Sequence, residues 1–386
     1  MLSSVQTRIT EGMIDLGVGH PSLDLLPLAE MEQAGRLRFG QEDPSFLQYG
    51  AEAGDEGLRQ QLGAFLSARS GVRVEPDELF ISGGVSQALD LICTAFTRPG
   101  DTVVVEEPTY HLALSIFRSH GLKVVGVPLT PDGLNIERLE GLVAEHRPRL
   151  LYTIPTFQNP SGRTLDAGQR RELVDLAERG DFLVLADEVY QHLSFGDAPL
   201  PSFGALVDSR RVLSLGSFSK ILAPGLRLGW VHAHPELLGA LEGSGMLVSG
   251  GGISPFTAAM VRGVLDLGLL GPYLDRLRRT YAGRAACLAD ALRQFGPGAL
   301  SFEGPAGGYF IWASLPAGLS SAALLKVARE GGVEFKPGGL FSLTQAQEGR
   351  LRLCFSYYDE EPLREGARRL GAALHDVLGV GEREGS

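Results

Sequence analysis

The stretch that decides the fold class reads Ser217-Phe218-Ser219-Lys220-Ile221-Leu222-Ala223-Pro224-Gly225-Leu226-Arg227. It directly follows an apolar run at 211–215, as a loop follows a buried strand. A lysine attacks aldehydes when burial or nearby positive charge favours its neutral amine. Two hydroxyls lie beside Lys220 and an arginine follows, so the set suits an aldehyde that also carries a phosphate. A lysine on a solvated loop is the ordinary alternative, and the neighbouring strands decide between the two.

Two further apolar runs end in polar residues. Residues 182–186 are typical of a strand buried on both faces and lead into Asp187, and residues 150–154 lead into the loop of Asn159. Taken singly, Asp187 also fits a helix cap and the Asn159 loop an ordinary turn. In an open α/β sheet, however, ligands bind at the carboxyl ends of the strands. Delivery of Lys220, Asp187 and Asn159 to one such edge favours a site for pyridoxal 5′-phosphate.

The pattern around these motifs predicts the fold class. Residues from about 80 to 233 alternate short apolar runs with helical patterns, which predicts an α/β fold with a mainly parallel sheet covered on both faces. At 386 residues the chain exceeds the roughly 250 to 300 residues at which a single core stops growing, so two lobes are expected. The charged and apolar pattern from Leu270 to Phe295 predicts a long helix that bridges them.

Composition excludes several classes of function. The formal net charge of −11 argues against a nucleic-acid surface and against an anionic membrane as partner. Cys93, Cys287 and Cys354 are widely spaced in apolar stretches, so they are expected to be reduced core residues, with no metal site and no disulfide framework. The amino terminus lacks the apolar core of a signal peptide, and no run of about 18 apolar residues predicts a membrane span. A cytoplasmic location is therefore expected.

A glycine-rich segment supplies a candidate phosphate site. Gly83, Gly84, Val85 and Ser86 precede a helical run at 87–96, so backbone amides and a helix amino terminus point at one place. An ordinary turn with Ser86 as helix cap explains the same residues equally well. Neither of the two common nucleotide motifs, G-x-G-x-x-G after a strand or G-x-x-x-x-G-K-[ST], occurs in the chain.

With these motifs in order, the sequence resembles the fold-type I, class I/II aminotransferases, and most closely the subgroup of kynurenine and 2-aminoadipate aminotransferases. The resemblance runs from about residue 14 to about residue 374. Besides the Asn159, Asp187 and Lys220 motifs, it rests on the blocks Ile14–Pro21, Leu47–Gly50, Ser82–Leu89, Glu107–Tyr110, Pro305–Trp312 and Leu351–Leu353.

The resemblance implies a large domain with a mainly parallel seven-stranded sheet between helices, plus a smaller α+β domain. The expected divisions are an amino-terminal segment at 1–44 that packs with the small domain, a large cofactor-binding domain at 45–275, and a small domain at 276–386. It also implies a homodimer with shared active sites, in which Tyr49 reaches the cofactor phosphate of the neighbouring subunit.

The resemblance further assigns the cofactor's contacts. Gly84, Val85 and Ser86, completed by Ser217, Ser219 and Arg227, would hold the phosphate. The family usually has Ser then Gln where this chain has Val85 and Ser86, so the backbone contacts carry over and those side-chain contacts do not. Four residues would contact the cofactor ring. Asp187 would keep its nitrogen protonated, Asn159 and Tyr190 would bond its phenolate oxygen, and Tyr110 would stack on its face.

The expected activity is a ping-pong transamination. Lys220 would hold the cofactor and, once displaced by an amino acid, move the α-proton as base and then as acid, with Asp187 and Tyr190 as the other catalytic residues. Arg352 would bind the substrate α-carboxylate as a bidentate fork, beside Asn159 and Gly19. The expected substrates are an aliphatic, aromatic or 2-aminoadipate-like amino acid and a 2-oxo acid such as 2-oxoglutarate.

Two alternatives remain. A carbon-sulfur β-lyase on the same scaffold would keep nearly all these residues, and a cofactor-binding effector domain of a MocR-type regulator would need a DNA-binding segment in front. Substrate identity rests on the cover segment, where His20, Leu23, Leu25 and Leu26 are largely apolar and favour aliphatic or aromatic donors. Arg8 is the nearest candidate cation for a distal carboxylate.

Overall fold

The computed structural model describes residues 9–130, 133–198, 200–296, 298, 300–344 and 346–384. Its large sheet has the strand order β2-β9-β8-β7-β6-β3-β4-β5. These strands are β2 (Leu79–Ser82), β3 (Thr102–Glu107), β4 (Lys123–Thr130), β5 (Gly133–Leu134), β6 (Leu150–Thr153), β7 (Leu183–Asp187), β8 (Val212–Ser217) and β9 (Gly229–Ala233). The seven expected strands are present, and the two-residue β5 extends one edge as an eighth among the described residues.

The centre of this sheet is parallel, which confirms the expected α/β class. The strands β4, β3, β6, β7 and β8 pair in parallel, whereas β9 runs antiparallel to both β8 and β2. Every residue of β3, β6, β7 and β8 is buried, because helices cover both faces. The carboxyl ends of β6, β7 and β8 therefore meet at one edge, as the sequence predicted.

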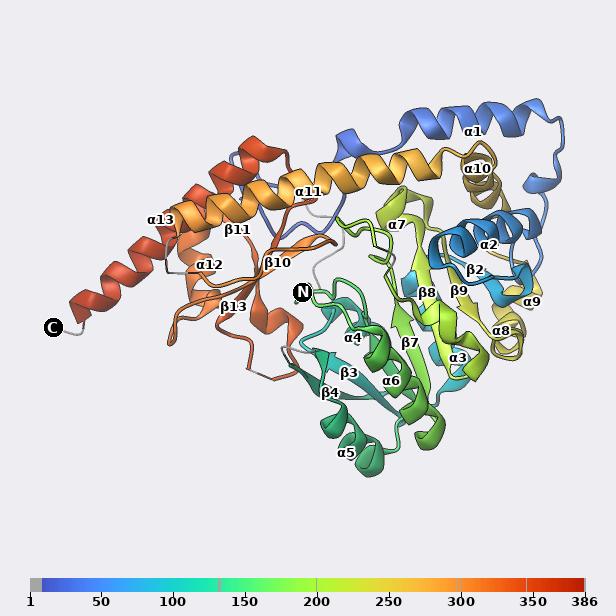
Figure 1. Ribbon diagram of the computed structural model, residues 1–386, viewed down its shortest axis with the longest axis horizontal. Helices are drawn as coiled ribbons and strands as arrows, with labels where there is room; N and C mark the ends of the chain where they lie inside the picture. The colour runs from blue at the N-terminus through green and yellow to red at the C-terminus, as the bar shows by residue number, and fades with distance from the viewer. Residues whose placement is uncertain are drawn as a thin grey trace.

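In the larger lobe, helices cover both faces of the sheet (Figure 1). They are α1 (Leu28–Gly40), α2 (Glu56–Ser70), α3 (Val85–Phe96), α4 (His111–Ser119), α5 (Ile136–His146), α6 (Ala167–Gly180), α7 (Phe218–Ile221), α8 (Pro235–Glu242), α9 (Gly245–Gly250) and α10 (Pro255–Asp266). The core on the face of α5 and α6 contains Val184 and Ala186, and the core on the face of α3 and α4 contains Leu183 and Leu185. Successive residues of a strand thus serve opposite cores.

The smaller lobe combines short strands with three helices. Its strands are β10 (Phe310–Ser314), β11 (Val333–Glu334), β12 (Lys336–Pro337) and β13 (Arg350–Cys354), and its helices are α11 (Leu270–Phe295), α12 (Ser321–Glu330) and α13 (Glu360–Glu384). The order β10-β13-β12 forms an antiparallel sheet, while β1 (Ile14–Asp15) pairs in parallel with β11. The amino-terminal segment therefore contacts the small lobe through β1, although α1 packs on α10 of the large lobe.

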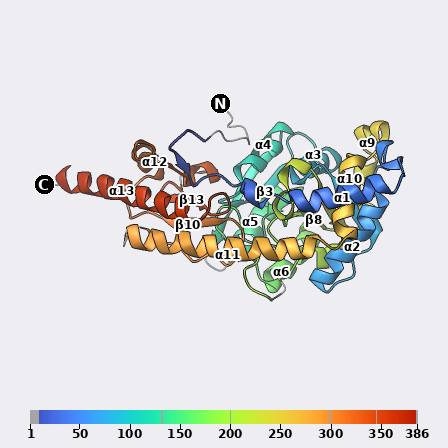
Figure 2. The ribbon, with the colours of Figure 1, turned by 90° about the horizontal axis from the view of Figure 1, so that it is seen from above.

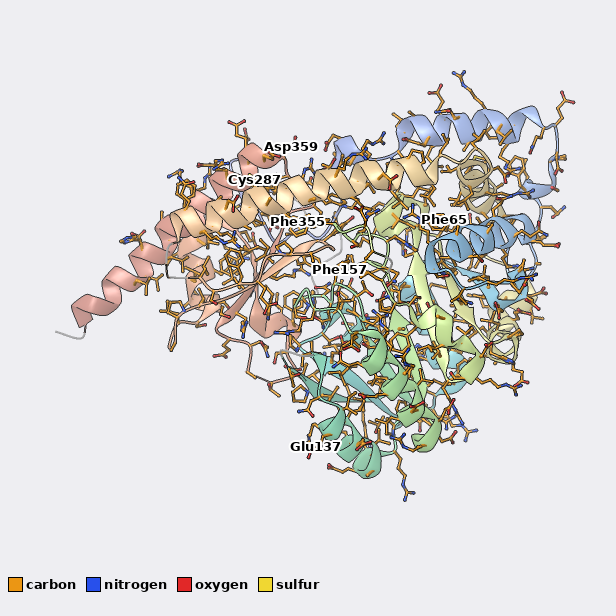
Figure 3. The ribbon with its side chains drawn as sticks, viewed as in Figure 1. Phe65, Glu137, Phe157, Cys287, Phe355 and Asp359 are labelled. Atoms are coloured by element: carbon orange, nitrogen blue, oxygen red, sulfur yellow. The ribbon has the colours of Figure 1, made fainter. Side chains whose placement is uncertain are left out.

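The long helix α11 joins the lobes, as expected from its sequence pattern (Figure 2). It begins before residue 276, so the domain divisions at 44/45 and 275/276 stay predictions that the fold does not mark with a break. Cys287 on α11 and Phe355 after β13 lie in the small lobe, far from Glu137 on α5 (Figure 3). All three cysteines are buried and free. Within the described part of the chain, no helix has the length and apolarity to cross a membrane.

Candidate active site

Lys220 lies one turn past the end of β8. The Ser217 hydroxyl accepts a hydrogen bond from the Ser219 amide at 3.1 Å, so the last residue of the strand caps the short helix α7. The Lys220 ammonium donates to the Gly19 carbonyl at 2.9 Å and lies 5.2 Å from the centre of the Tyr309 ring. Burial lowers the pKa of Lys220 to about 8, so a neutral amine is accessible at mildly alkaline pH.

Asp187 closes β7 as a buried carboxylate, 4% exposed. Its Oδ2 accepts a hydrogen bond from the Tyr152 hydroxyl at 2.7 Å, and its buried Oδ1 has no hydrogen-bond partner among the described residues. Burial raises the pKa of Asp187 to about 6, against the hydrogen bond from Tyr152, which lowers it. A buried carboxylate oxygen without a donor is costly, so Oδ1 is ready to accept from a cationic N–H of a bound group.

Arg352 and Asn159 come from different lobes and meet at the site. Arg352 on β13 donates to the Asn159 Oδ1 at 2.8 Å and to the Gly17 carbonyl at 2.9 Å. Arg352 is 5% exposed, its guanidinium lies 4.0 Å from the centre of the Phe310 ring, and its buried Nε has no partner in the described chain. Burial lowers the pKa of Arg352. Arg352 is therefore a buried cation with an N–H group still able to donate a hydrogen bond, and it is not a solubilising surface residue.

Aromatic rings surround these charges. The Tyr190 ring lies 5.5 Å from Tyr309 and 5.9 Å from Phe310, centre to centre, and is itself buried. Tyr110 precedes α4, and burial raises its pKa to about 12, with the negative charge of Asp187 acting in the same direction. Tyr110 is thus a neutral phenol whose ring is within electrostatic range of Asp187.

The expected phosphate site has its backbone in place. Gly84 is the N-cap of α3 with φ of 86°, a left-handed value that favours glycine, and its Cα faces the guanidinium of Arg227. A Cβ at Gly84 would lie 3.2 Å from the Arg227 Nη2. Gly84 and not Ser86 therefore caps the helix, and Ser86 is exposed in the first turn beside Val85. A helix amino terminus and an arginine converge there, as an anion requires.

The contact expected of Tyr49 lies between two subunits, and it stays a prediction. Tyr49 is 82% exposed, and its recorded hydrogen bond runs from its own amide to the neighbouring Gln48 side chain. The structure therefore does not bring Tyr49 to Lys220 of the same chain.

The structure adds residues that the sequence analysis missed. Glu106 at the end of β3 is fully buried and accepts from the Thr153 hydroxyl, from the Ile154 amide at 3.2 Å and from the Gln158 Nε2 at 2.9 Å. Gln158 also donates to the Pro108 carbonyl at 2.8 Å. Glu106 thus fixes the loop that carries Asn159. An acid ending a run of valines was the available signal.

These residues fit pyridoxal 5′-phosphate. The unpartnered Asp187 oxygen suits a protonated ring nitrogen, the lowered pKa of Lys220 suits attack on an aldehyde, and the Gly84 turn with Arg227 suits a phosphate. The sequence pattern of the family "Aminotransferase class I and II" matches residues 11–370.

Individual relatives cover nearly all of the chain. Aromatic-amino-acid aminotransferase 1 of Thermococcus litoralis is 32% identical over 374 residues, which are 96% of this chain and 89% of that protein. The alpha-aminoadipate aminotransferase of Thermus thermophilus, solved with N-(5′-phosphopyridoxyl)-L-leucine, superposes with a TM-score of 0.87 at 35% identity, covering 98% of this chain and 96% of that chain. The Pyrococcus horikoshii kynurenine aminotransferase superposes with a TM-score of 0.89 at 34% identity, covering 96% and 92%.

Proposed function

The chain belongs to the class I and II aminotransferases, and on that premise we propose which residues perform its reaction and which substrates it takes. The enzyme is a pyridoxal-phosphate-dependent transaminase that exchanges an amino group between an amino acid and a 2-oxo acid by a ping-pong mechanism. The observation that carries the assignment of residues is the buried, unpartnered Oδ1 of Asp187, in the electrostatic field of Lys220.

Pyridoxal phosphate, when bound, withdraws electrons from the substrate α-carbon. Asp187 would accept the hydrogen bond of the ring's N–H, and the Tyr152 hydroxyl holds the carboxylate in place through Oδ2. Asn159 and Tyr190 would donate to the ring oxygen, and Tyr110 would cover the ring face. The amides of Gly84, Val85 and Ser86 would hold the phosphate, together with the other three residues that the resemblance assigns to it, Ser217, Ser219 and Arg227.

Lys220 and Arg352 would act on the substrate. Arg352 would orient the amino acid by its α-carboxylate, beside Asn159 and Gly19, since its Nε has no partner in the described chain. Lys220 would then take the α-proton and deliver it to the cofactor carbon on the other side of the amino nitrogen, and a lowered amine pKa near 8 suits such a base. Positive charge on Arg352 also acts to lower the pKa of Lys220, so carboxylate binding and proton transfer are electrostatically linked.

For the amino donor we favour aromatic or aliphatic side chains. Burial lowers the pKa of His20 to about 4, and Lys220 and Arg352 act in the same direction, so His20 is neutral and offers a distal carboxylate no charge. In the same cover segment Leu25 is buried, whereas Leu23 is 76% exposed and does not cover the site of its own chain. Arg8, the expected distal cation, lies outside the described residues.

A homodimer agrees with an exposed apolar patch, which we call the end patch. In both ribbon views its elements gather at the end of the large lobe away from α13 (Figures 1 and 2). Its side chains are between 45% and 82% exposed and comprise Phe39, Leu47, Tyr49, Met246, Val248 and Phe256. Patches of this kind mark protein contacts. A partner subunit that covers the end patch would be in contact with Tyr49.

A cytoplasmic location is also proposed, from the sequence.

A half-reaction screen tests the proposed substrates. Purified enzyme would be mixed rapidly with single amino acids, and loss of the visible absorbance of the bound cofactor would be followed. Phenylalanine or leucine should convert the cofactor, and 2-oxoglutarate should restore it. A β-lyase would instead release pyruvate and a thiol from an S-substituted cysteine. In that case 2-oxoglutarate would not be needed to restore the absorbance of the cofactor. Failure of every amino acid to convert the cofactor would contradict transamination.

A further inference from the structure

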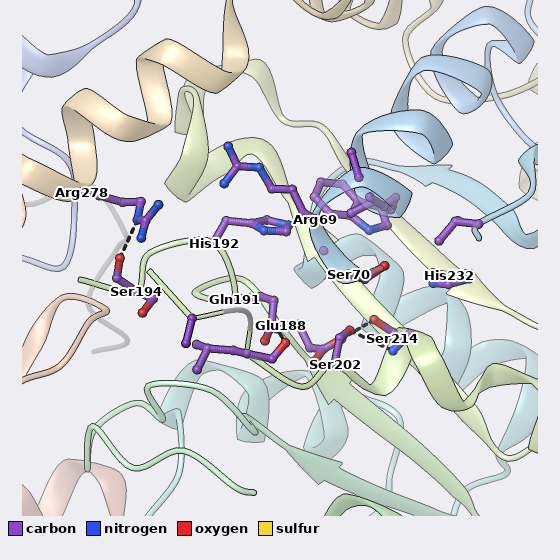
Figure 4. A pocket seen from close by; sticks show the side chains of 18 of the residues that line it. Arg69, Ser70, Glu188, Gln191, His192, Ser194, Ser202, Ser214, His232 and Arg278 are labelled. Carbon is purple, nitrogen blue, oxygen red and sulfur yellow. Dashed lines mark hydrogen bonds between the residues drawn. The ribbon is translucent and has the colours of Figure 1, made fainter. Parts of the chain in front are cut away.

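A cavity whose lining includes none of Lys220, Asp187, Asn159 and Arg352 lies close to the candidate active site, and we call it the rear cavity. Its volume is about 450 Å³, within the range of small-molecule sites. It lies between α2, the strands β8 and β9, the loop after β7, and the start of α11 (Figure 4).

The sheet itself separates the rear cavity from the candidate active site. Asp187 bonds to Tyr152 of the core under α3 and α4, whereas the next residue, Glu188, lines the rear cavity. Gly216 likewise lines the cavity, and its neighbour Ser217 caps the helix of Lys220. Side chains alternate between the faces of a strand, so the two sites share β7 and β8 back to back.

Trp230 gives the rear cavity an aromatic wall. Trp230 is 4% exposed and its indole lies close to Gly216, where an added Cβ would fall 2.0 Å from the indole Cε2. The indole N–H of Trp230 has no hydrogen-bond partner among the described residues. Leu66, Val74 and Leu200 add apolar surface. The wall suits a flat apolar ring.

The rear cavity also contains an arginine without an anion. The Arg69 side chain makes neither a hydrogen bond nor an ion pair within the described chain, and its guanidinium lies 5.2 Å from the centre of the Phe65 ring. Burial lowers the pKa of Arg69, and the charge of Arg278 acts in the same direction while Asp275 opposes both. Figure 4 shows Arg69 beside His192, and Arg278 next to Ser194.

The other charged groups of the lining are already matched. Glu188 accepts from Arg170 at 3.0 Å, from Ser202 at 2.8 Å and from Ser214 at 2.6 Å. Arg278 donates to the carbonyls of Ser194 and Gly196 and lies 4.0 Å from the carboxylate of Asp197, which also lines the cavity. Burial lowers the pKa of His192 to about 3 and of His232 to about 4, so both rings are neutral. Arg69 is therefore the unmatched charge of the described lining.

We propose that the rear cavity binds a small aromatic monocarboxylate, with its ring on Trp230 and its carboxylate on Arg69. Arginine pairs with carboxylates through two parallel hydrogen bonds, and aromatic faces prefer stacked or edge contacts. This site is distinct from the one that Arg352 provides for substrate, because the sheet lies between them. It does not depend on the proposed transamination.

Tryptophan fluorescence tests the proposal directly. The chain has two tryptophans, so Trp312→Phe leaves Trp230 as the sole reporter. The probe is 4-nitrobenzoate, whose nitroaromatic ring quenches a tryptophan that it contacts, added to the holoenzyme. Saturable quenching is expected. Adding Arg69→Gln should weaken the affinity by at least about tenfold, and the uncharged 4-nitrobenzamide should bind correspondingly less tightly.

Two controls separate this site from others. Arg73→Gln removes one charge from the nearby surface, where the side chain is 85% exposed, and should leave the affinity unchanged. Arg352→Gln removes the proposed substrate cation and should also leave the quenching unchanged. Absence of saturable quenching would overturn the proposal, as would equal quenching by the uncharged probe. Quenching lost with Arg352→Gln but retained with Arg69→Gln would assign the binding to the active site instead.

Discussion

At the residue scale, the chemistry depends on how each buried charge is matched. Asp187 has one oxygen bonded by Tyr152 and one oxygen without a partner in the described chain, so it is half-satisfied until a donor binds. Arg352 has two bonded nitrogens and a buried Nε without one. Incompletely matched buried charges are typical of sites that await a ligand.

Asp187→Ala should retain cofactor but lose turnover by about two orders of magnitude or more, equal to roughly 3 kcal/mol of barrier. The reason is that the ring nitrogen loses the charge that keeps it protonated. Tyr152→Phe is the matched control, because it removes only one donor to the same carboxylate and should cost about tenfold. Steady-state rates and cofactor absorbance would be measured together. Near-normal turnover in Asp187→Ala would reject the assigned role.

Glu106 gives a prediction about pH. Burial raises its pKa from 4.5 to about 7, although the donors Thr153 and Gln158 act to lower it. The stability contributed by this group is fully present below pH 4.5 and is lost as the pH rises through 7. At about 1.4 kcal/mol per pKa unit, the loss amounts to roughly 3 kcal/mol.

Glu106→Gln should therefore flatten the dependence of Tm on pH between 4.5 and 7. Asp187, whose pKa is also raised by burial and whose charge helps to raise the pKa of Glu106, remains in both proteins. Thermal unfolding of the two proteins across this pH range is the measurement. Parallel curves would show that Glu106 is not the buried titrating group.

The sequence predicted the residues at strand ends but not their partners. Lys220, Asp187 and Asn159 each follow an apolar run, so their common edge could be inferred from the order of elements. Tyr152 lies inside such a run and has no distinguishing pattern. Its hydroxyl reaches Asp187 because β6 and β7 pair with Tyr152 opposite Leu185, and that register is set by the folded sheet.

At the element scale, α6 anchors two loops through one arginine. Arg170 is 1% exposed and donates to Glu188 at 3.0 Å, to the Pro155 carbonyl at 2.9 Å and to the Thr156 hydroxyl at 2.8 Å. It thereby holds the loop after β6 against the loop after β7. The helical patterns between the apolar runs predicted a helix in this part of the chain, but they did not distinguish a buried arginine from its exposed neighbours.

Arg170→Ala should lower the free energy of unfolding by about 3 to 5 kcal/mol, because it leaves Glu188 buried and unpaired. Arg179→Ala on the same helix is the control. Arg179 pairs with Glu140 at 3.1 Å where both side chains are more than half exposed, so its loss should cost less than about 1 kcal/mol. Denaturant unfolding would compare the two. Equal losses of unfolding free energy in the two variants would contradict the role of Arg170 in holding the two loops together.

At the scale of the whole molecule, both lobes contribute residues to the site, and the proposed dimer would add Tyr49 from a second chain. Arg352 comes from the small lobe and Lys220 from the large lobe, joined through contacts with Gly17 and Gly19 of the amino-terminal segment. The sequence indicated two lobes and the bridging helix α11. It did not indicate the rear cavity, because its lining comes from elements far apart in the chain.

The proposed dimer predicts complementation between inactive proteins. Tyr49→Phe and Lys220→Ala chains should each be inactive alone, yet a mixed dimer should regain activity, because one site then has both residues intact. Activity after mixing and re-association would be measured, with each variant incubated alone as control. A monomer by light scattering would refute the shared site.

The most direct test of the central claim is the location of the cofactor. Purified enzyme should be yellow, and borohydride should attach the cofactor covalently to Lys220, as identified by peptide mapping. Lys220→Ala treated in the same way should give no labelled peptide. A label on any other lysine, or the absence of a label in the unmodified enzyme, would contradict the account of this active site.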